Sequence, residues 1–159
     1  MATGVSTGLN FGLTSGVITT LGLIVGLHAG TQSLLAVIGG VITIAVADGM
    51  SDALGIHISK EAENTLSTAQ LWVATGVTFA AKFLMALSFL VPILLLPLNM
   101  AVWVSIGWGM LVITLLSFGV ARSQREGPAL VIAEHLSIAL VVVVLTHLLG
   151  QWVASMFGA

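Results

Sequence analysis

The chain has 159 residues; 58% of them are hydrophobic and only 6% are charged, and the mean hydropathy is +1.17. Because a soluble domain carries roughly 25% charged residues, this composition excludes an ordinary soluble fold. The formal net charge of −2 gives no reason to expect a nucleic-acid partner. The absence of cysteine excludes disulfides and thiolate metal sites.

The charged residues are bunched, so long apolar stretches carry none of them. Residues 2–47, 84–121 and 135–159 contain no Asp, Glu, Lys or Arg. Runs such as Val141 to Leu145 do not alternate between apolar and polar residues, as the strands of a membrane β-barrel do. The expected fold is therefore an all-α integral membrane protein, a single transmembrane domain over residues 1–159 with the lipid bilayer as its partner.

About 20 residues are needed for each membrane-spanning helix, so we expect five such helices. The first has no Lys or Arg before its apolar run, unlike a cleaved signal peptide, and is expected to be a true span. Residues 29–32 form the expected turn after it, Pro92 is expected to kink the third helix, and Pro128 suits the first turn of the fifth. The expected spans are residues 8–28, 33–61, 71–96, 102–120 and 128–154.

The positive charges predict which end of the bundle faces the cytoplasm. Lys60 lies at the end of the second span, Arg122 and Arg125 follow the fourth, and the other two connections carry no positive charge. By the positive-inside rule, the N-terminus is cytoplasmic and the C-terminus external. In a prokaryote, the membrane would be the plasma membrane.

The first predicted helix carries two runs of glycine at a spacing of four residues, on faces turned well away from each other. Small residues at this spacing let a neighbouring helix approach closely. We therefore expect a central helix, or a helix at a dimer seam. The first run consists of Gly4, Gly8, Gly12 and Gly16, and the second of Gly22, Gly26 and Gly30.

The second predicted helix carries Asp48 and Asp52 at positions i and i+4, so both carboxylates project from one face of an apolar span. Charged residues inside a membrane are costly and usually mark a pathway or an ion site. Lys82 and Glu134 fall in the same half of the membrane, so we expect all four charges to form one cluster. Such a cluster suits a divalent cation held by oxygen atoms. Two alternatives for Lys82 stay open: a structural partner of the carboxylates, or a counter-ion that a cation or proton displaces.

Further candidates surround this cluster in the sequence. Met50 is a candidate thioether ligand, although most methionines in apolar helices are packing residues. His57, Glu61 and Glu63 are candidate metal ligands at the cytoplasmic mouth, where a histidine is more often simply interfacial. The polar residues of the first helix either line a pathway or hydrogen-bond to other helices; they are Asn10, Thr14, Ser15, Thr19 and Thr20.

Enzymatic activity is not expected. The sequence has no glycine-rich phosphate loop with its lysine, no His-Glu-x-x-His and no Gly-x-Ser-x-Gly motif. No permanently bound cofactor is predicted either.

Residues 11–27 (FGLTSGVITTLGLIVGL) and 46–64 (VADGMSDALGIHISKEAEN) resemble the first two helices of the vacuolar iron transporter family. Residues 88–98 and 145–153 resemble its third and fifth helices more loosely. The resemblance implies a five-helix protomer and a homodimer formed through the first helix. It also implies export of Fe²⁺ or Mn²⁺ from the cytosol in exchange for protons, with the metal as substrate.

The chain departs from the family pattern at the positions that matter most for metal. Ser15 stands where the family has its transport aspartate, Asp52 where it has a methionine ligand, and Ile44 where it has a glutamate. The cytosolic metal-binding insert that the plant members carry between the second and third helices is also missing. Two other hypotheses therefore remain: a non-transporting membrane subunit that assembles with a partner, and a relative that transports another solute.

Overall fold

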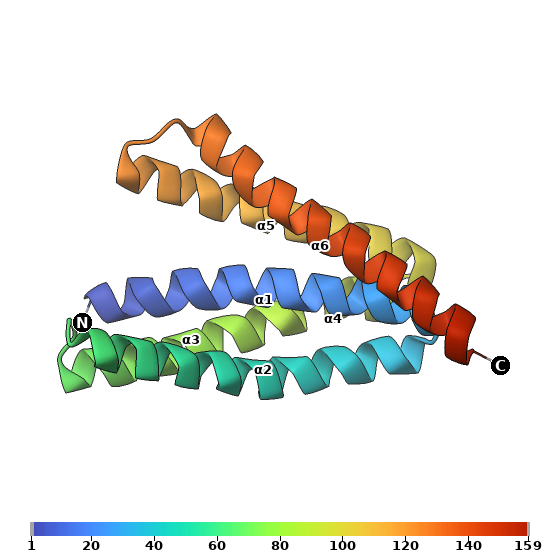
Figure 1. Cartoon of the computed structure of the whole chain (residues 1–159), viewed down its shortest axis with the longest axis horizontal. Helices are drawn as coiled ribbons and strands as arrows, with labels where there is room; N and C mark the ends of the chain where they lie inside the picture. The colour runs from blue at the N-terminus through green and yellow to red at the C-terminus, as the bar shows by residue number, and fades with distance from the viewer. Residues whose placement is uncertain (1, 159) are drawn as a thin grey trace.

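The computed structural model describes residues 2–158. Its helices are α1 (Ala2–Thr31), α2 (Leu34–Glu63), α3 (Thr68–Ser88), α4 (Leu90–Leu95), α5 (Leu98–Gln124) and α6 (Pro128–Phe157), as Figure 1 shows. With α3 and α4 taken together, five helical segments are long and apolar enough to cross a membrane. The structure thus confirms the predicted all-α fold with five apolar spans, which indicates a multi-pass membrane protein.

The connection between α1 and α2 is shorter than the turn predicted at residues 29–32. The helix continues to Thr31, and only Gln32 and Ser33 separate it from α2. Gln32 adopts the left-handed region, with φ at 50°, which reverses the chain direction. The Ser33 hydroxyl then accepts a hydrogen bond from the Ala36 N–H (3.2 Å) and caps α2. Because Ser33 caps α2 directly after Gln32, these two residues are enough to connect the helices.

The polar segment after α2 is also shorter than the sequence suggests. The helix extends to Glu63, and Asn64 ends it in the left-handed region, with φ at 51°. Ser67 and Gln70 form a reciprocal capping box that starts α3 at Thr68. Only residues 64–67 therefore remain outside the two helices.

Pro92 interrupts the third span at a single residue, Phe89, whose φ of −71° and ψ of −19° are still helical, as expected of a kink. A proline in a helix has no N–H to donate and its ring collides with the carbonyl four residues earlier, here that of Ser88. Accordingly, α3 ends at Ser88 and the short α4 follows from Leu90. After Pro97, α5 begins at Leu98, four residues earlier than predicted, whereas Pro128 occupies the expected first turn of α6.

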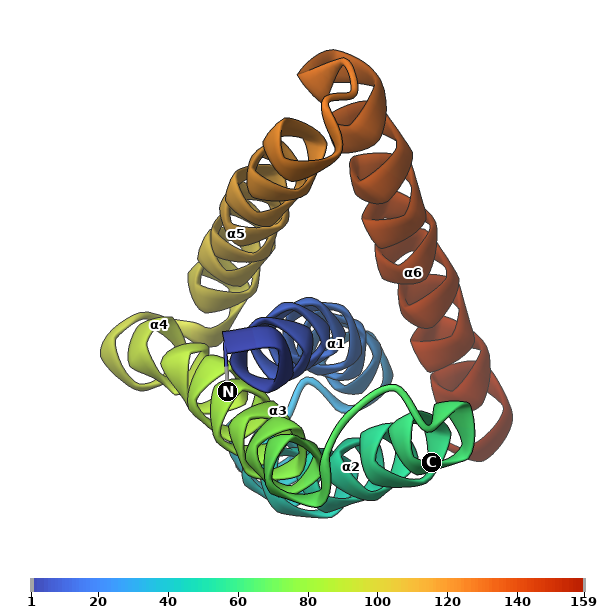
Figure 2. The ribbon, with the colours of Figure 1, turned by 90° about the vertical axis from the view of Figure 1, so that its left-hand side faces the viewer.

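The first helix lies at the centre of the bundle, where it packs against α2, α3, α5 and α6 (Figure 2 shows these helices around it). Both glycine runs are used for this packing. A Cβ added at Gly12 would lie 2.6 Å from the Thr78 carbonyl oxygen of α3, and one added at Gly30 would lie 3.2 Å from the Gly150 oxygen of α6. Each small-residue groove therefore holds a helix of the same chain.

The connections sort to two ends of the bundle. The N-terminal end of α1, the α2–α3 connection and the α5–α6 connection lie at one end, and the α1–α2 turn and the end of α6 lie at the other (Figure 1). We call the first the N-terminal end. There, α5 and α6 diverge from α1, whereas all the helices approach one another toward the other end. Lys60, Arg122 and Arg125 thus share the N-terminal end.

Candidate functional site

Three helices place polar side chains at the same depth in the bundle. Ser15 on α1, Asp48 on α2 and Lys82 on α3 each lie about 14 residues along their helices from the N-terminal end. At 1.5 Å per residue, this depth is about 20 Å, close to the middle of a membrane. Because α2 and α3 run antiparallel, Asp48 and Lys82 lie at the same depth in the bundle.

Lys82 is the most deeply buried charge in this group, with 1% of its side chain exposed. Its Nζ lies 2.5 Å from Asp48 Oδ2 and 2.5 Å from Asp52 Oδ2. It also donates a hydrogen bond to Ser15 Oγ at 2.9 Å. Three oxygen atoms from two other helices thus surround an ammonium group that has three N–H donors.

The two carboxylates are not equivalent. Asp52 accepts hydrogen bonds from Lys82 and from the Ser15 hydroxyl (2.5 Å), and its side chain is 19% exposed. Asp48 is 29% exposed, and its Oδ2 meets Lys82 outside hydrogen-bonding angles, so that contact is an ion pair without a hydrogen bond. Asp52 is therefore the better-anchored oxygen donor, and Asp48 is the one freer to change partner.

Ser15 connects the base to the acid. Its oxygen accepts from Lys82 while its hydroxyl proton is donated to Asp52, so the three side chains form a closed ring of contacts. Thr19, one turn further along α1, donates its hydroxyl to the Ser15 carbonyl at 2.9 Å. We call Ser15, Asp48, Asp52 and Lys82 the Lys82 cluster.

Formal charges limit what the Lys82 cluster can bind. With Lys82 protonated, two carboxylates and one ammonium carry a net charge of −1. A divalent cation placed between the carboxylates would leave the cluster with a net charge of +1 unless Lys82 withdrew or lost its proton. Two charged groups of the same sign close together in a medium of low dielectric are strongly unfavourable. Metal and ammonium therefore exclude each other at these oxygens.

Glu134 does not join this cluster, so the prediction that all four membrane charges meet is wrong for this residue. It lies about six residues from the start of α6, which places it about 9 Å from the N-terminal end, well short of the depth of Lys82. Its helix packs against α1 and α5, and its side chain is exposed. Within residues 2–158, no group of three or more His, Asp or Glu side chains is placed to hold a metal ion.

Met50 also lies apart from the carboxylates. It is two positions from both Asp48 and Asp52, which turns it about 200° around α2, and it is 59% exposed. A thioether ligand from this residue is therefore not supported. Of the polar residues on α1, Asn10 and Thr14 are exposed on its N-terminal half, and only Ser15 reaches the cluster.

The predicted group at the mouth of the bundle is divided among other partners. His57 Nδ1 lies 2.8 Å from the Thr75 hydroxyl, which itself donates to the Leu71 carbonyl, so the imidazole is the donor. The same ring lies 4.6 Å from the Trp72 ring, centroid to centroid. These contacts tie α2 to α3.

The glutamates of that group are separate from the imidazole. Glu63 pairs with Lys60 at 2.8 Å, and this contact lowers the number of carboxylate oxygens available for a metal at the mouth. Glu61 is exposed. A joint metal site of His57, Glu61 and Glu63 is therefore not formed in the described part of the chain.

Two polar contacts were not predicted from the sequence. His135 Nδ1 lies 2.8 Å from the Ser117 hydroxyl, and His28 Nε2 lies 2.8 Å from Asn99 Oδ1. The positions of the residues could have indicated the second contact. His28 comes one turn before the end of α1, and Asn99 falls in the first turn of α5. In an up-and-down bundle these two ends meet.

Comparison with known proteins leaves the site to be interpreted from its geometry. No family model, no curated protein and no solved structure matches the chain.

Proposed function

We propose that the chain transports divalent metal cations, Fe²⁺ or Mn²⁺, across a membrane, with Asp48 and Asp52 as the central ligands. The observation that supports this most strongly is the ammonium of Lys82, buried at mid-depth between two carboxylates on a neighbouring helix. Ionisable residues at this depth are expensive and usually belong to an ion pathway. The choice of metals rests on the resemblance of α1 and α2 to the vacuolar iron transporters.

In this mechanism Lys82 is a resident counter-ion. When no metal is present, its ammonium balances one of the two carboxylate charges. It also contacts the second carboxylate, so neither carboxylate lies in the apolar bundle without a cationic partner. An arriving divalent cation takes the two carboxylate oxygens, which are the hard ligands such metals prefer. Lys82 then moves away or gives up its proton, so each metal bound releases positive charge from the cluster. Proton exchange requires the second course, in which one proton leaves the cluster for each metal ion bound.

The proposal includes an orientation and an assembly. The N-terminus lies on the cytoplasmic side with Lys60, Arg122 and Arg125, and the C-terminus lies outside. Export from the cytosol therefore begins at the N-terminal end.

A homodimer through α1 would use its N-terminal half, where Leu9, Asn10 and Phe11 are exposed because α5 and α6 diverge. Disulfide trapping of the Phe11→Cys variant in native membranes tests this; a protein that stays monomeric contradicts it.

Flux in proteoliposomes tests the transport function. The purified chain is expected to carry Mn²⁺ or Fe²⁺ down a gradient, and the double variant Asp48→Asn, Asp52→Asn is expected to lose at least about 90% of that flux, since two charge-bearing ligands are removed. Glu134→Gln is the matched control, because it removes an exposed carboxylate outside the cluster and should leave flux intact. No flux of either metal, or full flux in the double variant, overturns the proposal.

A second candidate is a membrane protein that does not transport, in which the cluster only holds α1, α2 and α3 together. Its supporting observation is that Lys82 already has three oxygen partners and needs no further ligand. A buried ion pair of this kind fixes which helices meet, even where it adds little stability.

Lys82→Met separates the two functions. If Lys82 competes with metal, this variant keeps both carboxylates without their competitor, and Mn²⁺ should raise its thermal stability more than that of the unaltered chain. If the cluster is only structural, Mn²⁺ should leave the melting temperature of both proteins unchanged.

A further inference from the structure

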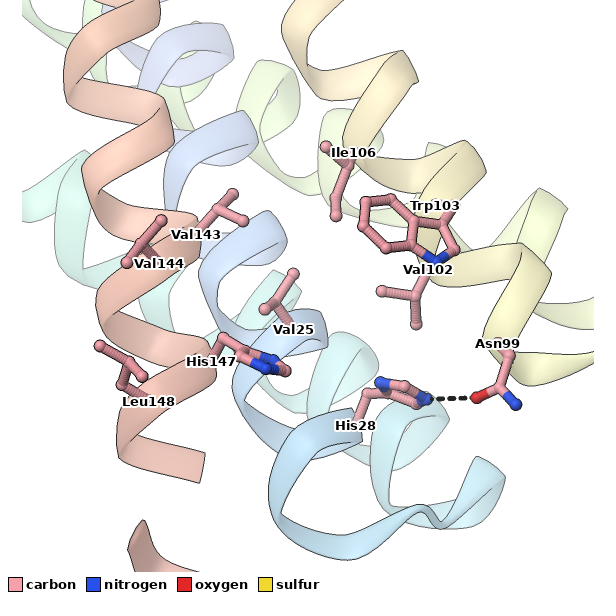
Figure 3. Close-up of a pocket in the computed structure, with 10 residues that line it drawn as sticks. All are labelled: Val25, His28, Asn99, Val102, Trp103, Ile106, Val143, Val144, His147 and Leu148. Carbon is pink, nitrogen blue, oxygen red and sulfur yellow. Dashed lines mark hydrogen bonds between the residues drawn. The ribbon is translucent and has the colours of Figure 1, made fainter. Parts of the chain in front are cut away.

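A cleft separate from the Lys82 cluster opens between α1, α5 and α6 near the end opposite the N-terminal end. It has a volume of about 350 Å³. Figure 3 shows its walls, which are formed by the last turns of α1, the first turns of α5 and the middle of α6. Most of its lining is aliphatic or aromatic, and its polar side chains are His28, Asn99 and His147.

The polar and apolar residues of this cleft are separated along the bundle axis. His28 lies one turn from the end of α1 and Asn99 in the first turn of α5, whereas Ile106 lies about two turns further into α5. On α6, Val143 lies one turn deeper than His147. Figure 3 shows the three polar side chains at one side of the cleft and Ile106 with Val143 at the other. The cleft thus changes from polar to apolar in the direction in which a bilayer does.

The outer side of the cleft holds hydrogen-bond donors that no other side chain uses. His28 Nε2 donates to Asn99 Oδ1 at 2.8 Å, so the N–H of the neutral imidazole and the amide oxygen are both used, and the amide N–H₂ of Asn99 remains. The imidazole of His147 and the indole N–H of Trp103 have no polar partner among residues 2–158. No carboxylate lines the cleft. Its polar end therefore suits an acceptor group of negative charge, such as a phosphate.

We propose that this cleft is a binding site for one phospholipid molecule. Its phosphate lies between Asn99 and His147, whose N–H groups are free, and an acyl chain lies along Val143 and Ile106. An apolar cleft open to a bilayer is filled by hydrocarbon, because water there would leave its hydrogen bonds unmade. The phosphate adds the acceptor that the donors lack. This site is independent of metal transport, since it shares no residue with the Lys82 cluster.

Native mass spectrometry of the purified full chain in detergent tests the lipid site. The probes are dioleoyl phosphatidylglycerol, dioleoylglycerol with the same chains but no phosphate, and inorganic phosphate. We expect one phosphatidylglycerol per protomer, bound at least about tenfold more tightly than dioleoylglycerol, since hydrogen bonds to a charged group are worth about that factor or more. Inorganic phosphate at millimolar concentration should not displace the lipid.

Two variants localise the binding. His147→Leu should weaken phosphatidylglycerol binding about tenfold through the lost donor, whereas His135→Leu, which alters a histidine of the same helix outside the cleft, should not. Val143→Trp fills the apolar part and should abolish the complex; it serves as the second test if His147→Leu does not fold. Equal binding of dioleoylglycerol, displacement by inorganic phosphate, or unchanged binding in both cleft variants would overturn the proposal.

Discussion

A single ammonium group joins three helices at mid-depth in the bundle. Lys82 contacts Asp48 and Asp52 on α2 and Ser15 on α1, and its own helix packs against both. Because the two carboxylates differ in hydrogen bonding and exposure, they should differ in what their removal does. Asp52 holds Lys82 and Ser15 together, whereas Asp48 makes an ion pair alone.

Neutralising the two carboxylates one at a time should reveal this difference. Asp52→Asn alters the carboxylate that accepts from both Lys82 and Ser15, and it should lower the free energy of unfolding by about 1–3 kcal/mol. This loss is smaller than the full cost of breaking a buried ion pair, because the Asp52 side chain is partly exposed. Asp48→Asn should cost less. Unfolding in mixed micelles measures both, with Lys60→Met as a surface control. A larger loss for Asp48→Asn would contradict the assignment of Asp52 as the anchor.

Ser15 offers a gain-of-function test at the same site. Ser15→Asp adds a third carboxylate beside Lys82 and changes the formal charge of the cluster from −1 to −2, so Mn²⁺ should bind at least about tenfold more tightly by calorimetry. Thr14→Asp is the matched control, because this neighbouring side chain is exposed and turned away from the cluster. Equal gains in the two variants would show a general charge effect rather than a ligand.

The sequence predicted part of this site for a clear physical reason. The i, i+4 spacing put Asp48 and Asp52 on one face, and the helix lengths put Lys82 at their level. It failed for Glu134 although α6 begins at the expected Pro128, because the packing of α6 against α1 and α5 decides which side chains Glu134 can meet. Met50 was close in sequence to both carboxylates but lies on another face of α2. Proximity in sequence alone therefore overestimated the ligand set.

At the scale of the helices, the glycine runs explain why α1 is central. The first run packs against backbone atoms of α3 and the second against α6. The spacing of the glycines predicted two close neighbours, but it did not identify which helices these would be, because any apolar helix fits such a groove. The structure shows that both grooves are filled within one chain.

Two glycines of α1 should respond differently to the same substitution. A Cβ at Gly12 would lie 2.6 Å from the Thr78 carbonyl oxygen, whereas one at Gly26 would lie 3.4 Å from the Thr146 oxygen, an ordinary contact. Gly12→Ala should therefore destabilise the protein by about 1–3 kcal/mol by forcing α1 from α3, and Gly26→Ala should be nearly neutral. Thermal unfolding in detergent measures both. A neutral Gly12→Ala, or a loss for Gly26→Ala as large as that for Gly12→Ala, would contradict this difference in packing.

At the scale of the whole molecule, composition and the distribution of charge were sufficient to predict the up-and-down topology. Long apolar stretches indicated helical spans, and the basic residues fell at alternate connections, so Lys60, Arg122 and Arg125 gather at one end. The divergence of α5 and α6 from α1 at that end was not predictable, since no local pattern encodes an angle between packed helices.

The orientation can be measured because the chain has no cysteine of its own. Thr65→Cys, in the α2–α3 connection, should react with a membrane-impermeant maleimide only after cells are permeabilised. Ser155→Cys, near the end of α6, should react in intact cells. The reverse pattern would place the N-terminus outside and would reverse the proposed direction of transport.

The most direct test of metal displacement is a crystal of the chain soaked in Mn²⁺ and measured for anomalous scattering. The proposed mechanism predicts one strong peak between the carboxylates of Asp48 and Asp52, with Lys82 Nζ moved away from the 2.5 Å contacts it makes without metal. A peak at another place, or no peak while Lys82 keeps both carboxylates, would contradict it.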